Sequence, residues 1–575
     1  MPISICRRTL DFGLRVWDFN LRAVSKMLKA SGAMAAATLF SRVLGMVREM
    51  VYARFMGDGW VASAFALAFT IPNLFRRLLG EGALTAAFIP IFKAKEKTHG
   101  EVEMWRAANA VISGLIIAAS VIIGIAMIGI SITLAYGSPH EIVNFSDPSG
   151  LPHFTTLDGV LHYGTPGHFS GQTLLMLRLL RVMFPYMLLV CIAAALMGML
   201  NARGHFFIPA MGATMLNVVM IASVLWLAPH MGTELSEQIF ALAFGVLVAG
   251  AAQAAFQLPA LWREGFRYRW VSPWRNETVR LVVTRMIPGT LGVAAFQINV
   301  LLTQTIAFWV GPHIVASFNY AVRLMELPQG MFGISLATFL LPALSALALD
   351  KNYPEFRATL RHGISTLLFA NLIAAILLVV LAGPIVRLLF ERGAFTAAST
   401  ERASLALICL APGLVAFSTV NILARAFFAL GDTKTPMIIS LACLTLNLLL
   451  AAALVVPLKQ GGLGIANTIT SVANAGLLFF ALRKKLGRLE MAPLRATFLP
   501  LAFAGIAAGI VAWLGWQFWE NKFGHETLAL KTGAVFVPAI AAGLVYGILA
   551  LTFKIPAAHE IAGLVFARFR QTPRA

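Results

Sequence analysis

The segment IPNLFRRLLGEGALTAAFIPIF, residues 71–92, decides the fold class because it is long and apolar enough to cross a membrane. About 20 apolar residues in an α-helix span the ~30 Å hydrocarbon core of a bilayer. Yet Arg76, Arg77 and Glu81 stand near the middle of this segment. Charged side chains at that depth are rare and face a cavity or a partner, so the segment indicates a membrane helix with a functional role.

The whole chain shares this apolar character. Of its 575 residues, 59% are hydrophobic and 12% are charged, whereas soluble domains carry roughly 25% charged residues. This composition excludes a soluble protein and predicts an all-α polytopic membrane protein. The net charge of +20 is typical of cytoplasmic loops rich in Lys and Arg, so we do not expect nucleic acid as a partner.

Apolar runs between polar breaks predict about fourteen transmembrane helices. Residues 1–26 lie before the first of them as a basic N-terminal extension, and residues 554–575 follow the last as a cytoplasmic tail. The predicted spans are 28–56, 60–92, 108–135, 173–200, 207–229, 237–262, 286–310, 314–346, 362–390, 401–428, 436–457, 462–482, 496–518 and 532–553.

The breaks between these helices alternate in charge. Lys and Arg cluster in breaks after even-numbered helices, at 93–106, 263–280, 351–361 and 483–495. The longest break after an odd-numbered helix, 136–172, contains neither residue. Because positive loops stay in the cytoplasm, both termini are predicted to be cytoplasmic.

Two segments of the chain, 184–210 and 411–437, are alike. The offset carries the fourth predicted helix onto the tenth, and a shift of six helices preserves orientation. We therefore predict two six-helix lobes related by a pseudo-twofold axis along the membrane normal: an N-lobe over 27–265 and a C-lobe over 266–487, followed by two extra helices over 488–553. The matched residues, 227 positions apart, are Pro185 and Pro412, Gly204 and Gly431, and Pro209 and Pro436.

Charged side chains on three predicted helices are candidates for a functional site, and Arg54, near the end of the first of them, is set aside because it can snorkel to the interface. The two clearest internal pairs are Arg77 with Glu81 (i,i+4) and Arg323 with Glu326 (i,i+3). The five arginines nevertheless outnumber the three glutamates. Two positive charges therefore have no acidic counterpart in the count, which indicates a cavity for an anion. The arginine fork matches phosphate oxygens two at a time. Helix–helix contacts and snorkelling remain an alternative explanation. The charged residues are Arg42, Arg48 and Glu49 on the first helix, Arg76, Arg77 and Glu81 on the second, and Arg323 and Glu326 on the eighth.

Several chemistries have no support in the sequence. The chain has no Walker-type glycine loop and no paired acidic motif in a cytoplasmic break to hold a metal ion. An ATPase and a metal-dependent enzyme acting on lipid-linked sugars are therefore not expected, and we expect no cofactor. We predict that the protein is not an enzyme.

Six stretches of the chain resemble the MurJ (MviN) family of lipid II flippases, within the superfamily of multidrug and polysaccharide exporters. The resemblance implies two lobes around a V-shaped cavity, alternating access, and a place in a bacterial inner membrane. It also implies that the last two helices form a groove for the lipid tail. The stretches are FSRVLGMVREMVYARFMG, IPNLFRRLLGEGALTAAFIPIF, LRVMFPYMLL, YAVRLMELPQGMFGISLATFLLPALS, LFERGAFT and DTKTPM.

The resemblance assigns roles to the eight charged residues and names a cargo. The cargo would be lipid II, an undecaprenyl-diphosphate-linked disaccharide peptide, and the other expected partners are membrane lipids and cell-wall synthesis proteins. The substrate-binding residues would be Arg42, Arg48, Arg76 and Arg323, and the supporting residues Glu49, Arg77, Glu81 and Glu326.

The chain departs from the family pattern at three places. Ser63 and Val322 stand where relatives frequently have an acid, and the seventh and eleventh helices lack the acids through which some members bind sodium. Sodium coupling is therefore not expected, and membrane potential is the predicted drive. Two alternatives stay open: export of another polyprenyl-diphosphate-linked glycan or amphipathic compound, and a scaffold of cell-wall synthesis without transport.

Overall fold

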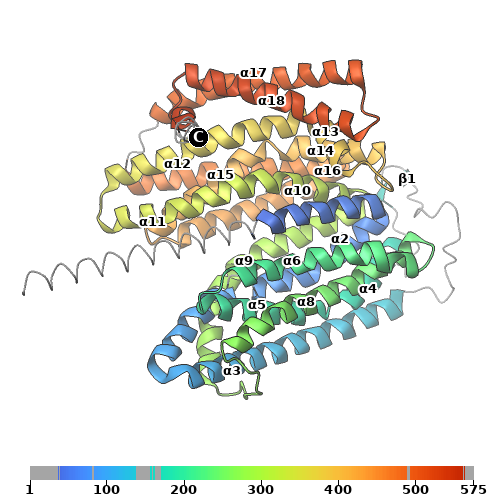
Figure 1. The fold of residues 1–575 in the computed structure, drawn as a ribbon, viewed down its shortest axis with the longest axis vertical. Helices are drawn as coiled ribbons and strands as arrows, with labels where there is room; N and C mark the ends of the chain where they lie inside the picture. The colour runs from blue at the N-terminus through green and yellow to red at the C-terminus, as the bar shows by residue number, and fades with distance from the viewer. Residues whose placement is uncertain are drawn as a thin grey trace, which may run out of the picture. The chain divides into compact units, whose positions relative to one another are not determined.

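The computed structural model describes residues 37, 39–80, 83–137, 156–157, 160–161, 170–487, 492–560 and 562–563. Almost all of these residues are helical, as Figure 1 shows. The described exceptions to the helices include a small antiparallel ladder of β1 (Thr156–Leu157) and β2 (Val160–Leu161). The predicted all-α membrane fold is confirmed. The predictions for residues 1–26 and Glu81 fall outside the described residues.

The chain forms two compact units. Unit 1 contains the chain up to Val51 and from Ala68 to Val293, and unit 2 contains Tyr52–Leu67 and everything from Ala294 onward. The segment Tyr52–Leu67 thus packs within unit 2 although unit 1 flanks it on both sides in the sequence. The predicted lobe limits remain predictions.

Unit 1 surrounds a core in which α3 packs against α5. Met104 and Met199 are fully buried there, and Phe92 and Phe266 are almost so. The elements are the first part of a helix over 39–56, the end of α2 (Trp60–Phe75), η1 (Arg76–Gly80), α3 (Ala83–Gly137), α4 (Gly171–Met183), α5 (Tyr186–Ala202), α6 (Phe207–Ala222), η2 (Ser223–Leu227), η3 (Ala228–His230), α7 (Leu235–Gln238), α8 (Phe240–Arg263) and the first half of α9 (Glu277–Val310).

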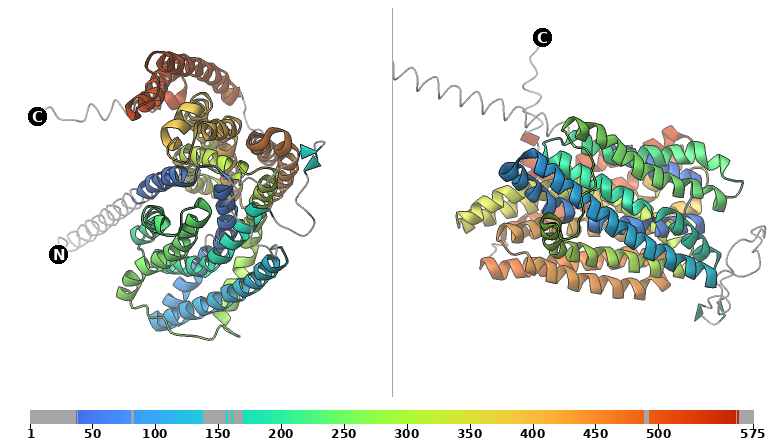
Figure 2. Two further views of the ribbon diagram at one scale, coloured as in Figure 1. Left: turned by 90° about the vertical axis from the view of Figure 1, so that its right-hand side faces the viewer. Right: turned by 90° about the horizontal axis from the view of Figure 1, so that it is seen from below.

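Unit 2 has two apolar clusters. One joins α11, α12 and α15 around Leu344 and Phe427, and the other joins α17 and α18 around Ala508 and Tyr546. Figures 1 and 2 show α17 and α18 side by side. Besides 52–67 and the end of α9, the elements are α10 (Ile314–Pro328), η4 (Gln329–Ile334), α11 (Ser335–Leu349), α12 (Tyr353–Val380), α13 (Ala382–Phe390), α14 (Ala397–Leu410), α15 (Gly413–Ala429), α16 (Lys434–Leu486), α17 (Ala492–Phe523) and α18 (Leu528–Thr552).

Within the described ranges, nine helices are long and apolar enough to cross a membrane, or up to eleven if two bent pairs are each one span. The predicted count of fourteen is not confirmed. Two of the nine are too long for one crossing: α3 has 55 residues and α16 has 53, about 80 Å each if straight. Each contains one non-helical residue, Gly100 (φ 83°) in α3 and Lys459 (φ 50°) in α16, where two helices meet.

The structure contains the repeat that the sequence predicts at its two central prolines. Pro185 separates α4 from α5, which are bent by 44°, and Pro412 separates α14 from α15, which are bent by 46°. A proline within a helix cannot donate an amide hydrogen bond and its ring displaces the preceding turn. The same residue type therefore produces the same bend in each unit.

The glycines of the repeat end α5 and α15 in the same way. Gly204 (φ 87°) and Gly431 (φ 73°) both have the left-handed conformation. The amide that follows the glycine donates to a carbonyl of the last helical turn, His205 to Leu200 and Asp432 to Phe427, each at 2.9 Å. This bond is typical of a Schellman cap, which satisfies carbonyls at a helix end. The repeat therefore extends to individual hydrogen bonds.

Candidate functional site

The first helix carries two of the candidate arginines, Arg42 and Arg48. Arg48 Nη2 donates to Glu49 Oε1 at 2.5 Å, and both side chains are 12% exposed. Arg42 is half-buried, and beside it the Ser41 carbonyl accepts a hydrogen bond from Asn217 Nδ2 at 3.2 Å, so α6 packs on the helix here. The predicted contact of Glu49 with the arginines is present at Arg48.

Arg76 begins the π-helix η1, directly after α2. Its Nε donates to Asn73 Oδ1 at 2.7 Å, one turn earlier. The amide oxygen accepts from the guanidinium, so this contact orients the Arg76 side chain. Single π turns inside α-helices are rare and frequent at functional sites. Arg77 is the next residue of η1, but Glu81 lies outside the described residues, so their pairing remains a prediction.

Arg323 lies on α10, five residues before that helix ends at Pro328. Its Nη1 donates to Glu326 Oε2 at 2.8 Å, and both side chains are 44% exposed. The predicted i,i+3 pair is confirmed. An exposed pair of this kind contributes little to stability, about 0–1 kcal/mol, so its carboxylate can be exchanged for another anion at low cost.

A π segment lies beside the candidate arginine in both of these helices. In unit 1 it is η1, which contains Arg76, and in unit 2 it is η4, which begins three residues after Glu326. Arg42, Arg48 and Arg76 belong to unit 1, and Arg323 belongs to unit 2. Their convergence on one cavity remains a prediction.

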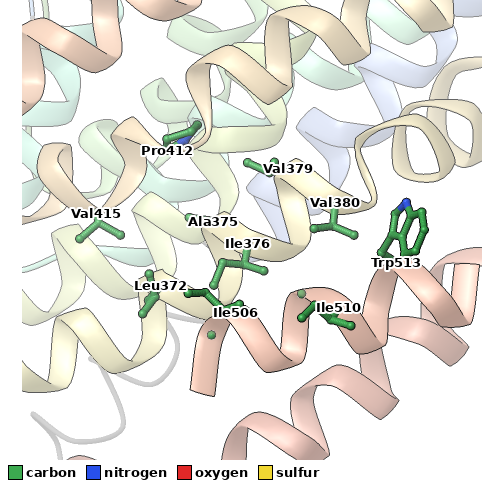
Figure 3. Close-up of a pocket in the computed structure, with 12 residues that line it drawn as sticks. Leu372, Ala375, Ile376, Val379, Val380, Pro412, Val415, Ile506, Ile510 and Trp513 are labelled. Carbon is green, nitrogen blue, oxygen red and sulfur yellow. The ribbon is translucent and has the colours of Figure 1, made fainter. Parts of the chain in front are cut away.

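Unit 2 also contains an apolar groove between α12, α15 and α17, shown in Figure 3. Its volume is about 670 Å³. The lining is suited to a hydrocarbon chain, because none of the described residues that line it is charged. The lining residues are Leu372, Ala375, Ile376, Val379, Val380, Pro412, Val415, Gly505, Ile506, Gly509, Ile510 and Trp513.

The most deeply buried described carboxylate was not predicted as a site residue. Asp58 is 3% exposed and lies in the turn between the first helix and α2. Arg402 of α14 binds it through both ends of its fork, Nε to Oδ2 at 2.7 Å and Nη2 to Oδ1 at 2.8 Å. The hydroxyls of Ser317 and Ser399 donate to the same two oxygens at 2.6 and 2.7 Å. All four residues belong to unit 2.

These donors decide the charge of Asp58. Burial alone would raise its pKa, but hydrogen bonds from Arg402, His313 and the two serines outweigh burial and hold the pKa below its usual range. Asp58 is therefore a carboxylate at neutral pH, and Arg402 balances its charge inside the protein.

Ser63 lies close to Asp58 and makes contacts of its own with unit 2. Its hydroxyl donates to the Pro312 carbonyl at 2.6 Å and accepts from the Ala316 amide at 3.3 Å, so it binds the same end of α10 as Asp58. The resemblance places an acid at this position in many relatives. In this chain the acid lies five residues earlier, between Gly57 and Gly59. A charged residue between two glycines, at a turn between apolar helices, is the signal that could have found it.

Comparison with known proteins decides the family. The chain matches the family described as Lipid II flippase MurJ over residues 52–146 and 160–556. It belongs to the MurJ family. The match includes Arg76, Arg323, Asp58 and Arg402, whereas Arg42 and Arg48 lie just before it.

Curated MurJ relatives are similar over most of the chain. A Vibrio cholerae protein described as "Probable lipid II flippase MurJ" is 32% identical over 464 residues, 80% of this chain and 84% of the relative. A Burkholderia cenocepacia protein described as "Lipid II flippase MurJ" is 31% identical over 499 residues, 86% of this chain and 91% of the relative.

Solved structures share the fold. A structure of "Lipid II flippase MurJ, inward closed conformation" has a TM-score of 0.69 at 21% identity and covers 91% of this chain and 98% of that one. An inward-facing multidrug resistance MATE transporter of the MOP superfamily has a TM-score of 0.61 at 14% identity and covers 80% and 99%. The chain is therefore a multi-pass membrane protein with the transporter fold that MurJ and MATE proteins share.

Proposed function

We propose that this chain moves lipid II from the cytoplasmic to the outer leaflet of a bacterial inner membrane. The match to the MurJ family over nearly all of residues 52–556 carries the proposal. Transport breaks no covalent bond in the cargo, so the protein would act as a transporter and not as an enzyme.

The diphosphate of the cargo would bind to Arg42, Arg48, Arg76 and Arg323. Arginine–phosphate contacts are bidentate and charge-assisted, like the arginine–carboxylate contacts they would replace. The exposed Arg323–Glu326 pair supports this proposal, because a dianionic group can displace a carboxylate that contributes little to stability. Asn73 would hold the Arg76 guanidinium in a fixed direction.

The isoprenoid tail would lie in the groove of α12, α15 and α17. A chain of CH₂ and CH₃ groups gains about 0.8 kcal/mol per buried CH₂, and the lining has no charged group that would need a partner. The tail would thus stay in an apolar environment while the head group crosses.

Alternating access driven by membrane potential would complete the cycle, with both termini in the cytoplasm. Moving one charge across 100 mV is worth about 2.3 kcal/mol, so a charged cavity that changes its access responds to the potential. We propose no sodium ion and no cofactor.

The test is complementation of a bacterium depleted of its own flippase. We expect the wild-type chain to restore growth, and Arg76→Ala and Arg323→Ala to abolish rescue at equal membrane levels. Arg106→Ala is the matched control, because Arg106 is 68% exposed and its ion pair with Glu103 is long, at 3.7 Å. We expect it to rescue as well as wild type.

Each other outcome has a distinct meaning. If both site variants rescue normally, the arginines are structural and the diphosphate site is wrong. If the folded wild type fails to rescue, the cargo is another lipid-linked glycan. If it rescues but does not expose lipid II at the outer leaflet of reconstituted vesicles, the protein is a scaffold.

A further inference from the structure

The segment Tyr52–Leu67 connects the two units in an unusual way. It packs within unit 2, but the chain continues into unit 1 at both of its ends. Any movement of unit 1 against unit 2 must therefore pull this segment away from unit 2 or bend the two helices that carry it. The contacts of the segment decide which of these happens.

Several apolar side chains of the segment are buried, among them Val61 and Phe65, and its turn adds a set of polar contacts with the rest of unit 2. Asp58 receives both ends of the Arg402 fork and two serine hydroxyls. The Tyr320 hydroxyl donates to the Gly57 carbonyl at 3.0 Å. Buried contacts between full charges depend steeply on geometry, because removing one partner leaves the other buried without compensation. Such a contact is either made or broken and does not slide.

The backbone around Asp58 is also closely packed. The Ala394 amide donates to the Arg54 carbonyl at 2.9 Å. Gly57 has φ +59°, and a Cβ added there would lie 2.5 Å from the Ala394 carbonyl oxygen. Gly393, with φ +62°, meets the Arg54 carbonyl in the same way. Two turns, 57–59 and 391–396, thus meet backbone to backbone with a glycine in each.

We propose that Asp58 and Arg402 form a latch, which holds the turn 57–59 on unit 2 and must release in every transport cycle. This inference rests on the proposed transport by units that move against each other. By the charge pattern of the loops, the latch lies at the outer end of the helices. It keeps that end closed while the cargo enters from the cytoplasm.

The chemistry of the pair suits a reversible closure. When the latch opens, water solvates Asp58 and Arg402 separately, so neither charge is left buried without a partner. When it closes, the bidentate geometry restores a single register between the two turns. An apolar contact of the same size would be harder to separate in water and less specific in register.

The first experiment measures opening without any cargo. Ala316 is 4% exposed and its amide binds Ser63 within the closed contact. In a chain whose four native cysteines are replaced by alanine, Ala316→Cys becomes a reporter for a membrane-impermeant thiol reagent added to intact cells. We expect Asp58→Asn and Arg402→Gln each to raise the labelling rate at least about tenfold. The labelling rate of the double variant should exceed that of either single variant by less than twofold, because the two residues act as one unit.

Glu103→Gln is the control, because Glu103 is a 42% exposed acid of α3 in unit 1. It should leave the labelling rate of the reporter unchanged. Rates for Asp58→Asn and Arg402→Gln within twofold of the parent would overturn the latch. The unfolding temperature of each variant is measured in detergent. A faster labelling rate supports the latch only in a variant whose unfolding temperature lies within a few degrees of that of the parent.

A second experiment covers the case in which the latch variants fail to fold. Ser63→Cys with Ala316→Cys keeps Asp58 and Arg402 and places one thiol on the segment and one on α10, at positions where the Ser63 hydroxyl lies 3.3 Å from the Ala316 amide; oxidation is used to cross-link them. We expect the oxidised protein to stop complementing and the reduced protein to recover. Full activity of the cross-linked protein would overturn the latch. If the chain complements no flippase-depleted strain, the labelling experiment still tests the latch, so failure of the proposed function is distinguishable.

Discussion

Gly57 and Gly59 lie two residues apart, on either side of Asp58, and they differ in backbone conformation and in surroundings. Gly57 has a left-handed backbone and direct contact with the Ala394 carbonyl, whereas a Cβ at Gly59 would meet nothing within 4 Å. Gly57→Ala should therefore lower the free energy of unfolding by about 1–2 kcal/mol from backbone conformation, and by more from the clash. Gly59→Ala should leave it nearly unchanged.

Thermal unfolding of the purified protein in detergent micelles measures this difference. A lower unfolding temperature for Gly57→Ala alone is the expected result. Equal temperatures for the two variants would contradict the close contact between the turns.

Single residues could be predicted from the sequence only where their partners lie on the same helix. The Arg323–Glu326 pair followed from i,i+3 spacing and is present. The Asp58–Arg402 pair joins residues 344 positions apart, and spacing within a helix carries no information about such a contact. Charge counting also overlooked Asp58, because it falls in a turn and not in a predicted span.

At the scale of the element, an ion pair joins the two ends of α16. Asp432 precedes α16, and its carboxylate contacts Lys485 Nζ near the far end of that helix at 2.5 Å. It also accepts from the Thr435 amide at 3.0 Å. The two ends of α16 meet at this pair, which supports its being two antiparallel helices joined at Lys459.

The pair predicts a pH dependence. The hydrogen bond from Lys485, followed by that from the Thr435 amide, lowers the pKa of Asp432 from 3.8 to about 2. Because the folded pKa lies below the unfolded one, this stabilisation is complete above about pH 4 and is lost as pH falls toward 2. Asp432→Asn should remove this part of the pH dependence, and Lys485→Met should reduce it, in unfolding temperatures measured from pH 5 to pH 2. Curves parallel to wild type would contradict the assignment.

The elements themselves were partly predictable. The prolines that bend the helices stand out in the sequence, and the bends are present. The predicted helix 362–390 is instead α12 and α13, interrupted at Leu381 (φ −101°). Pro384 has no amide hydrogen to bond the carbonyl of Val380 four residues earlier, which accounts for the interruption. The π segments η1 and η4 could not be predicted, because composition does not distinguish a π turn from an α turn.

At the scale of the whole molecule, the groove of unit 2 predicts that a larger side chain in its lining reduces transport. Ile510 lines the groove and is 53% exposed, whereas Ile540 on α18 is 60% exposed and does not line it. Ile510→Trp should reduce complementation at least about tenfold at normal membrane level, because the indole would occupy the space of the tail. Ile540→Trp, the same change on a neighbouring helix, should rescue fully. Equal rescue by both variants would argue against the groove as the tail site.

The large-scale plan was predictable where it depends on repetition and composition. The apolar runs predicted a helical membrane protein, and matched prolines and glycines predicted corresponding positions in two halves of the chain. The placement of 52–67 in unit 2 was not predictable, because a repeat assigns continuous segments to each half. Long-range contacts such as those of Asp58 decide that placement.

That placement has a consequence for how the protein is made. Ribosomes add about 5–20 residues per second, and 344 positions separate Asp58 from Arg402. The turn around Asp58 therefore leaves the ribosome about 17–70 s before its partner. Until then the carboxylate needs water or the insertion machinery, and the first hairpin must enter the membrane without its final neighbours. Unit 2 completes its fold only by recruiting a segment made 344 residues before Arg402, so assembly of this turn is a late step in biogenesis.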